Sequence, residues 1–366
     1  MFKTEELKSS LLNLMKTFLI GLVVVVYASL LATLFIGQIG IGVNNFPELR
    51  IDGSSTVYPL MEAAAEAVLK EMPDIRVAVG VSGTGGGLKR FCRGEIDLAQ
   101  ASREMKSQEA NDCKIRGINF KQETVALDAI AIVVNRDNDW AYELTLDELK
   151  SLWQPAPRYK AHKIKNWRDI RSNWPDTPIN LFGPGIDSGT FDFFTKVVVG
   201  TAGATRSDFT SSEDDNLIVS AVSRNKYALG YLGYSYYFAQ RDKLRAVAIE
   251  QKILEQKIVE QNTIEQKSIA GVVKSQANSF VQDPRPPIKK FVLPSYESVA
   301  SGDYAPLTRP LFIYYQTSQK DPISQGGNPK KLKIVDRFMT FIRANRNRLA
   351  TEVGLLPLQN SLVPSP

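Results

Sequence analysis

A long uncharged apolar run near the N-terminus is the first feature of the hydrophobic pattern. Residues Thr17–Gly37 contain no charged side chain, and about 20 apolar residues are enough to cross the hydrocarbon core of a bilayer. Lys8 and Lys16 precede the run, so the positive-inside rule leaves the N-terminus in the cytoplasm and the rest of the chain outside. We expect an uncleaved signal-anchor, because a cleaved export signal usually has a shorter apolar core. A cleaved signal peptide is the alternative.

Between residues 49 and 105 the pattern alternates between strand and helix. Leu49–Ile51 predicts a short strand, and apolar residues at helical spacing follow from Leu60 until Pro73 ends the helix. The segments "IRVAVGV" and "IDLAQAS" alternate as strands, and a second helix is predicted from Leu88. Strands that alternate with helices predict a parallel α/β sheet.

Polar turns follow the predicted strands, at residues 52–56, 82–87 and 101–104. In open α/β sheets, ligands bind at the carboxyl ends of the strands, where helix N-termini present free N–H groups to an anion. The second turn, in "VSGTGGGLK", is not a nucleotide P-loop, because no Ser or Thr follows Lys89. We expect these turns to converge on one anion site, with Thr84–Gly87 as a turn and Lys89 facing solvent.

The same alternation returns in the second half of the chain. The turn Asp187–Thr190 lies between a strand and a helix within Ile179–Val199 and repeats the design of the earlier turns. The other predicted elements are a strand at 124–138, a short helix from Leu144 with Thr145 as its N-cap, a strand and packed turn at Lys226–Tyr237, a strand at Arg309–Gln316 and an amphipathic helix from Lys333.

A repetitive insert interrupts this pattern. Four five-residue repeats begin at Ile249, Leu254, Val259 and Ile264. A period of five does not keep one apolar face on a helix, so we expect a low-complexity surface segment. An extended Pro-rich linker, Gln282–Lys290, follows it. A partner-binding role is the alternative to an inert loop.

Composition and charge narrow the classes of function. The chain has 366 residues, of which 43% are hydrophobic and 23% are charged, enough for two domains with their own cores. The net charge of +6 suits anionic ligands. The sequence shows no dense Lys/Arg run interleaved with aromatic residues, which argues against nucleic-acid binding.

Residues suited to catalysis or metal binding are few. The single histidine, His162, is far along the chain from every Ser-Gly turn, and "GIDSG" does not match the G-x-S-x-G nucleophile elbow. The cysteines and the histidine form no zinc-binding cluster in the sequence. We therefore expect no enzyme activity, no metal and no cofactor.

Two cysteines, Cys92 and Cys113, lie outside the apolar run, with 20 residues between them. In an exported chain such a pair can oxidise, and closing this loop would add roughly 3 kcal/mol of stability. We expect the disulfide, with two reduced thiols as the alternative.

Five ordered blocks of the sequence resemble a known family. They are "DGSSTVYPL", "VGVSGTGGGLKRFCRGEIDLAQASREM", "GPGIDSGTFDFF", "ALGYLGYSYY" and "LPSYESVASGDYAPLTRPLFIYY". From about residue 49 to 360, apart from the insert, the chain resembles the PstS phosphate-binding proteins of bacterial ABC transporters, above all their SphX-type branch in cyanobacteria. The resemblance implies the type II periplasmic-binding-protein fold, in which two α/β lobes joined by crossover strands close on the anion.

The resemblance also implies which residues bind phosphate. In this family they are hydroxyls and backbone N–H groups of the turns. They correspond to Ser55, Thr56 and Val57 in the first turn, Thr84 and Gly85 in the second, and Ser188, Gly189 and Thr190 in the second lobe.

Two positions depart from the enterobacterial pattern, in which an Asp follows the third strand and an Arg precedes the S-G-T motif. Here Ser102 and Arg103 end the third strand, and Pro184 stands where the Arg would be. We expect Arg103 to clamp phosphate with its bidentate guanidinium. The alternative is a surface ion pair with Glu104 or Asp97.

The missing Asp concerns selectivity between anions. The phosphate dianion keeps a proton that sulfate lacks, so a carboxylate acceptor can reject sulfate by repulsion. Asp187 and Asp192, which flank the S-G-T motif, are the candidates for this acceptor. The alternative for each is to cap the following helix.

We expect a signal-anchor or signal peptide with a linker at 1–44, a first lobe at 45–130 plus 291–366, a second lobe at 131–248, and the insert with its linker at 249–290. We predict a monomeric, periplasm-facing protein that captures inorganic phosphate and passes it to an ABC permease. The expected signal-anchor holds it at the inner membrane, and the cleaved signal peptide is the alternative. The alternatives are a binding protein for another oxyanion, such as sulfate or molybdate, and a membrane-anchored phosphate sensor.

Overall fold

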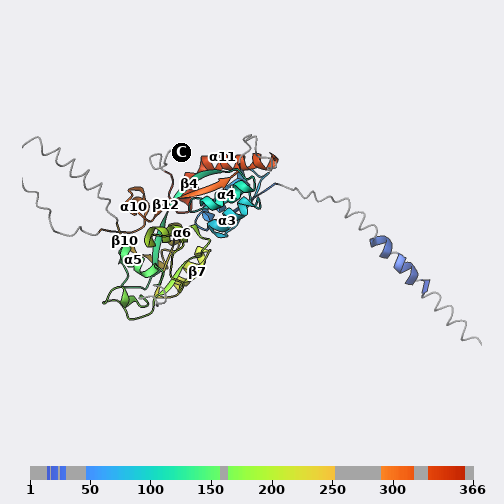
Figure 1. Ribbon diagram of the computed structural model, residues 1–366. Helices are drawn as coiled ribbons and strands as arrows, with labels where there is room; N and C mark the ends of the chain where they lie inside the picture. The colour runs from blue at the N-terminus through green and yellow to red at the C-terminus, as the bar shows by residue number, and fades with distance from the viewer. Residues whose placement is uncertain are drawn as a thin grey trace, which may run out of the picture. The chain divides into compact units, whose positions relative to one another are not determined.

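The computed structural model describes residues 15–16, 18–23, 25–29, 47–156, 164–251, 290–316 and 329–358 (Figure 1). His162, the repeats after Gln251, the linker at 282–289 and parts of the predicted signal-anchor lie outside these residues.

The chain divides into two compact units, Met1–Phe46 and Pro47–Pro366. In the first unit the described residues are helical, and apolar side chains such as Phe18 and Val25 are exposed. Within the described part of the chain, we find no helix both long enough and apolar enough to cross a membrane.

One mixed sheet runs through the second unit. Within the described ranges it has nine strands, in the order β2–β1–β3–β12–β4–β8–β6–β7 with β9 against β4. The strands are β1 (Glu48–Gly53), β2 (Arg76–Val79), β3 (Leu98–Ala101), β4 (Lys121–Asn135), β6 (Asn180–Pro184), β7 (Thr210–Ser212), β8 (Ala228–Gly233), β9 (Leu244–Ala246) and β12 (Thr308–Tyr315).

Strand β4 joins the two lobes. Its first half pairs antiparallel with β12, and its second half pairs antiparallel with β8 (Figure 1). Within each lobe the pairings of β1 with β2 and β3, and of β6 with β7 and β8, are parallel. The predicted fold class, two α/β lobes joined by crossover strands, is confirmed.

Helices pack on the sheet through apolar side chains. The helical segments are α2 (Tyr58–Glu71), α3 (Gly83–Cys92), α4 (Ser107–Ile115), α5 (Leu146–Trp153), η1 (Trp167–Asp169), α6 (Gly189–Phe194), η2 (Thr195–Val199), α7 (Asp215–Ser223), α8 (Tyr234–Ala239), α10 (Tyr296–Ala300) and α11 (Pro329–Glu352). In the first lobe, Leu98 of β3 joins the core formed with α2 and α11, whereas Ala99 joins the core formed with α3 and α4. The side chains of successive residues in the strand thus point to opposite faces of the sheet.

Residues 291–307 pack with the second lobe, not with the first lobe as the sequence predicted. Strand β11 (Phe291–Val292) pairs with β10 (Ala248–Glu250), which pairs in turn with β5 (Glu143–Leu144). Val299 and Leu307 belong to the second-lobe core. Because these apolar side chains are buried in the second-lobe core, the chain returns to the first lobe only at the start of β12. The start of the predicted surface repeats, at 249–250, is correspondingly part of a paired strand.

The glycine-rich stretch after β2 is helical, where the sequence predicted a turn at Thr84–Gly87. Helix α3 already begins at Gly83, which has a φ of 74°, in the left-handed region that favours glycine. A Cβ on Gly87 would lie 2.5 Å from the Gly53 Cα. Glycine is therefore needed for α3 to approach β1 this closely.

Other local predictions agree with the structure to different degrees. Thr145 is the N-cap of α5, and its hydroxyl accepts the Glu148 backbone N–H, as predicted. The packed turn predicted after β8 is instead the short helix α8. The predicted disulfide between Cys92 and Cys113 is present and joins α3 to α4.

Candidate functional site

Hydroxyl and charged side chains from both lobes are buried together beside the crossover strands. Arg309 of β12 and Asp128 of β4 are 1% and 0% exposed. Their buried polar neighbours are Ser55, Thr56, Thr84, Ser102, Ser188, Thr190 and Asp215. Such groups need hydrogen-bond partners, because leaving one buried and unpaired costs about 1–3 kcal/mol.

The Arg309 guanidinium lies at the centre of this cluster. Its Nη2 donates to Thr56 Oγ1 in the first lobe at 3.1 Å and to Thr190 Oγ1 in the second lobe at 2.8 Å. Its Nη1 donates to the Ser102 carbonyl at 3.3 Å. One rigid planar group with five donors therefore contacts residues of both lobes.

Asp128 fixes this guanidinium in place. Its Oδ2 accepts from Arg309 Nε at 3.2 Å and from Nη2 at 2.9 Å, while Oδ1 accepts from the Tyr234 backbone N–H at 3.2 Å. Burial raises the pKa of Asp128, and the adjacent Arg309 acts against that rise. Because both charges are almost inaccessible to water, each is compensated by the other, and removing one would leave the other buried without a partner.

The first predicted turn contacts the second lobe through two hydroxyls. Ser55 Oγ donates to Asp215 Oδ2 at 2.5 Å, and Thr56 Oγ1 lies 3.2 Å from Thr190 Oγ1. Val57 is the buried N-cap of α2, and its own N–H donates within the turn to the Ser54 carbonyl at 3.2 Å.

The second turn and the S-G-T motif approach each other closely. Thr84 Oγ1 accepts the Ser102 N–H at 3.1 Å and lies 3.3 Å from Ser102 Oγ. A Cβ on Gly189 would lie 2.5 Å from that Ser102 Oγ and 2.6 Å from Thr84 Oγ1, so only glycine allows this approach. Ser188 caps α6, and its Oγ accepts the Thr190 N–H at 3.0 Å.

The predicted clamp, Arg103, is held by carboxylates on all three guanidinium nitrogens. Nη1 and Nη2 each donate to Glu109 at 2.8 Å, and Nε donates to Asp192 in the second lobe at 2.7 Å. Lys106 Nζ lies 2.6 Å from the same Asp192 carboxylate. Burial alone would lower the pKa of Arg103, but the Glu109 and Asp192 carboxylates outweigh burial and raise it. Arg103 therefore links the lobes by an ion pair, and its clamp role stays a prediction.

Asp187 makes a second contact between the lobes, nearer the surface. Its carboxylate accepts from Lys89 Nζ at 3.0 Å, and its carbonyl accepts the Gly85 N–H at 2.8 Å. Lys89 is exposed, as predicted, but it is also paired. Asp187 and Asp192, the predicted selectivity residues, thus both pair with cations of the first lobe.

Asp215, the first residue of α7, has a strongly perturbed carboxyl group. It is 1% exposed, and its Oδ1 has no hydrogen-bond partner among the described residues. Burial raises the pKa of Asp215 from 3.8 to about 7; Ser55 and Arg309 act against this rise, and Asp128 adds to it. Asp215 therefore titrates near neutral pH, which is typical of functional carboxyls.

Sequence reasoning missed Arg309, Asp128 and Asp215. Asp128 had a usable signal, because it is the only charged residue in "TVALDAIAIVV", and a charge inside an apolar strand needs a partner. Arg309 begins a predicted strand, where an arginine is unremarkable by sequence alone.

A guanidinium surrounded by hydroxyls suits an oxyanion, whose oxygens accept charge-assisted hydrogen bonds. No group of three His, Cys, Asp or Glu side chains arranged to hold a metal ion occurs among the residues that the structure describes.

Comparison with known proteins agrees with this chemistry. The profile of the PBP superfamily domain matches residues 40–345. Protein SphX of Synechococcus elongatus is 38% identical over 307 residues, which cover 84% of this chain and 76% of that protein. The phosphate-binding protein PstS of Staphylococcus epidermidis is 31% identical over 305 residues, covering 83% and 76%.

The fold comparison extends to solved structures. A putative phosphate ABC transporter substrate-binding protein from Clostridium perfringens, solved with bound phosphate, matches with a TM-score of 0.61 at 23% identity, over 85% of this chain and 100% of that chain. At this identity the likeness shows the shared fold.

The burial of the Arg309–Asp128 pair generates a stability prediction. Asp128→Asn should lower the free energy of unfolding by about 3–5 kcal/mol, because it leaves the Arg309 charge buried without its partner. Urea unfolding in phosphate-free buffer at neutral pH measures this change. The matched control is Asp74→Asn, which breaks the exposed pair of Asp74 with Arg337 and should leave the stability nearly unchanged. Equal effects of the two substitutions would contradict the prediction.

Asp215 generates a pH prediction. Its folded pKa of about 7 exceeds the value of about 3.9 for an unfolded Asp, so the folded state holds an extra proton between these values. Its contribution to stability is therefore present below about pH 4, is lost as the pH rises to about 7, and changes no further above that.

Asp215→Asn should remove this loss, because the amide stays neutral. Unfolding of the variant should require more free energy than unfolding of the parent at about pH 8, with a smaller difference at about pH 4. Urea titrations at both pH values test this, with the exposed Asp242 replaced by Asn as the control. A parent–variant difference that is the same at both pH values would refute the assignment.

Proposed function

The chain belongs to the PBP superfamily and to the family of SphX and PstS proteins, and we propose that it captures inorganic phosphate between its lobes for uptake by an ABC transporter. The main support is that one buried guanidinium, Arg309, donates to hydroxyls of both lobes. The family has a binding role rather than a catalytic one.

Phosphate suits the chemistry of this cluster. The proposed site contains the hydroxyls of Ser55, Thr56, Thr84, Ser102, Ser188 and Thr190, the turns at Val57, Gly85 and Gly189, and the guanidinium of Arg309. Hydrogen bonds to a charged group contribute about 1.5–3 kcal/mol each, which offsets the dehydration of the anion. Because the donors come from both lobes, the ligand stabilises the closed arrangement over an open one.

Arg103 has a different place in this proposal from the one its sequence position suggested. It links the lobes through its ion pair with Asp192, and Arg309 rather than Arg103 binds the anion. The wall formed by Arg103, Lys106, Glu109 and Asp192 then stabilises the closed arrangement beside the site.

Selectivity rests on Asp215 in this proposal. Its ionised carboxylate can accept hydrogen bonds but cannot donate one. It therefore accepts a hydrogen bond from the proton of monohydrogen phosphate and repels sulfate, which carries no proton. Asp215 Oδ1 has no hydrogen-bond partner in the described part of the chain, whereas Asp187 and Asp192 are already paired with Lys89 and Arg103. This difference supports the role of Asp215.

The protein works outside the cytoplasm in this proposal. The apolar run at Thr17–Gly37 directs export and keeps the binding unit, as a monomer, near the inner-membrane permease that receives phosphate. In this proposal the described residues of the first lobe are 47–130, 308–316 and 329–358, and those of the second lobe are 131–156, 164–251 and 290–307.

Calorimetric titration with phosphate and with sulfate tests the function. We expect tighter binding of phosphate; tighter binding of sulfate would overturn the proposal. Arg309→Lys keeps the charge but loses the planar donors, and we expect it to cost about 2–5 kcal/mol of phosphate affinity. Arg103→Ala should cost less, and the exposed control Arg337→Ala should cost nothing measurable. If Arg103→Ala abolished binding while Arg309→Lys retained it, Arg103 would be the clamp.

A separate titration tests the role of Asp215 in selectivity. At about pH 8 the Asp215→Asn variant should show a ratio of phosphate to sulfate affinity that is roughly tenfold or more below that of the parent, because the amide can donate to either anion. Asp242→Asn is the charge-matched control. An unchanged ratio in Asp215→Asn would exclude this carboxylate as the discriminating group.

A further inference from the structure

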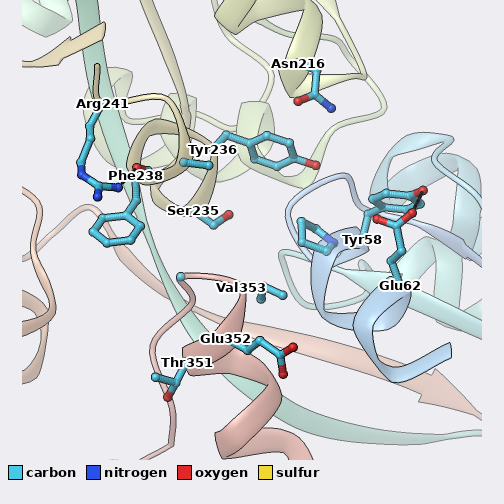
Figure 2. Close-up of a pocket in the computed structure, with 13 residues that line it drawn as sticks. Tyr58, Glu62, Asn216, Ser235, Tyr236, Phe238, Arg241, Thr351, Glu352 and Val353 are labelled. Carbon is cyan, nitrogen blue, oxygen red and sulfur yellow. Dashed lines mark hydrogen bonds between the residues drawn. The ribbon is translucent and has the colours of Figure 1, made fainter. Parts of the chain in front are cut away.

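A groove with a volume of about 480 Å³ lies beside the anion cluster and is lined by both lobes (Figure 2). We call it the interlobe groove. Tyr58 and Glu62 of α2 form one wall, and Glu352 and Val353 at the end of α11 form another; these belong to the first lobe. Ser235 and Phe238 of α8 line it from the second lobe. Its volume is in the usual range for ligand sites of about 300–1,000 Å³.

The first-lobe walls of the interlobe groove are acidic. Glu62 is exposed, and its Oε1 accepts from Tyr58 Oη at 2.9 Å; this hydrogen bond is the main cause that raises the pKa of Tyr58. Glu352 is paired only loosely, at 3.3 Å, with the exposed Arg348. The charged residues that line the groove are these two carboxylates and one cation, Arg241, and this negative excess favours a cationic occupant over a second anion.

Aromatic rings add a second element of recognition. The Phe238 side chain is 41% exposed, and Tyr58 and Tyr236 also line the interlobe groove. Arg241 lies toward the other end of the groove in Figure 2, with its guanidinium 4.4 Å from the centre of the Phe238 ring and Nη1 bonded to the Phe238 carbonyl. The protein thus already places one guanidinium on an aromatic ring of this groove.

A buried hydroxyl points into the interlobe groove. Ser235 is 3% exposed, and its Oγ has no hydrogen-bond partner among the residues that the structure describes. In Figure 2 this hydroxyl faces the space between Tyr58 and Val353. An unpaired buried hydroxyl needs a partner from outside the protein or from water.

We propose that the interlobe groove receives an arginine side chain from an extended segment of a partner protein. Arginine fits better than lysine, because its planar guanidinium pairs with carboxylates in two places and stacks on aromatic rings at once. Glu62 and Glu352 bind the guanidinium, the exposed rings pack against its face, and Ser235 Oγ bonds to the partner segment.

The interlobe groove is connected to the anion cluster by a short chain of hydrogen bonds. Tyr236 Oη donates to the Ser55 carbonyl at 2.8 Å, and Ser55 Oγ donates to Asp215. Asn216, the next residue after Asp215, lines the groove. Since the walls come from both lobes, closure of the lobes on phosphate assembles the groove, and the partner recognises the loaded protein. This dependence on phosphate rests on the proposed function.

A peptide titration tests the proposal on the full chain. The probe is acetyl-Gly-Arg-Gly-amide, and the matched peptide has citrulline, which keeps the shape but lacks the charge. In saturating phosphate we expect the arginine peptide to bind at least about tenfold more tightly than the citrulline peptide. The double variant Glu62→Gln/Glu352→Gln should weaken its binding by about tenfold, whereas Glu48→Gln/Glu297→Gln, with the same change in net charge at exposed sites, should not.

The outcomes separate this inference from the proposed function. Equal binding of both peptides, or equal weakening by the two double variants, overturns the arginine site. Arginine binding that is the same with and without phosphate overturns the coupling between groove and anion site. Direct titration with phosphate alone reports the proposed function, and we expect both double variants to bind phosphate like the parent.

Discussion

The arrangement of the candidate site depends on one buried ion pair, Arg309 with Asp128. Asp128 is fixed within β4, the strand shared by both lobes, and its Oδ2 accepts two hydrogen bonds from Arg309. A buried guanidinium without a partner would be costly, so the pair sets where the guanidinium can lie. Thr56 and Thr190 meet at this fixed point from opposite lobes.

Contacts farther from the crossover strands form directly between one lobe and the other. Arg103 reaches Asp192, and the Gly85 N–H reaches the Asp187 carbonyl. Each of these contacts joins groups of different lobes, so each exists only while the lobes are together. Gly189 permits them, because a side chain there would collide with Ser102 and Thr84. The fixed pair therefore positions the site, whereas the contacts between lobes determine how firmly it closes.

The sequence could predict the fold and half of the site, for identifiable reasons. Strand–turn–helix units and their hydroxyl-rich turns are local patterns, and the residues of those turns do meet in the structure. Arg309 lies 253 positions from Thr56, and only the pairing of β12 between β3 and β4 brings it there. Arg103 was the more visible arginine, because it lies within the turn predicted at residues 101–104. Without the tertiary contacts, nothing indicated that Glu109 and Asp192 would engage it.

The charge balance of the site explains how a doubly charged anion would be held there. Arg309 is matched by Asp128, and Arg103 by Glu109 and Asp192, so the protein itself neutralises these cations. Ionised Asp215 adds a negative charge. In the proposed function, net charge therefore adds little to the affinity, which comes from directional hydrogen bonds donated by the Arg309 guanidinium and by the hydroxyls of the turns. A carboxylate close to such a site is compatible with its function. It repels sulfate, which has no proton to donate, more than it repels monohydrogen phosphate, which can donate its proton to the carboxylate.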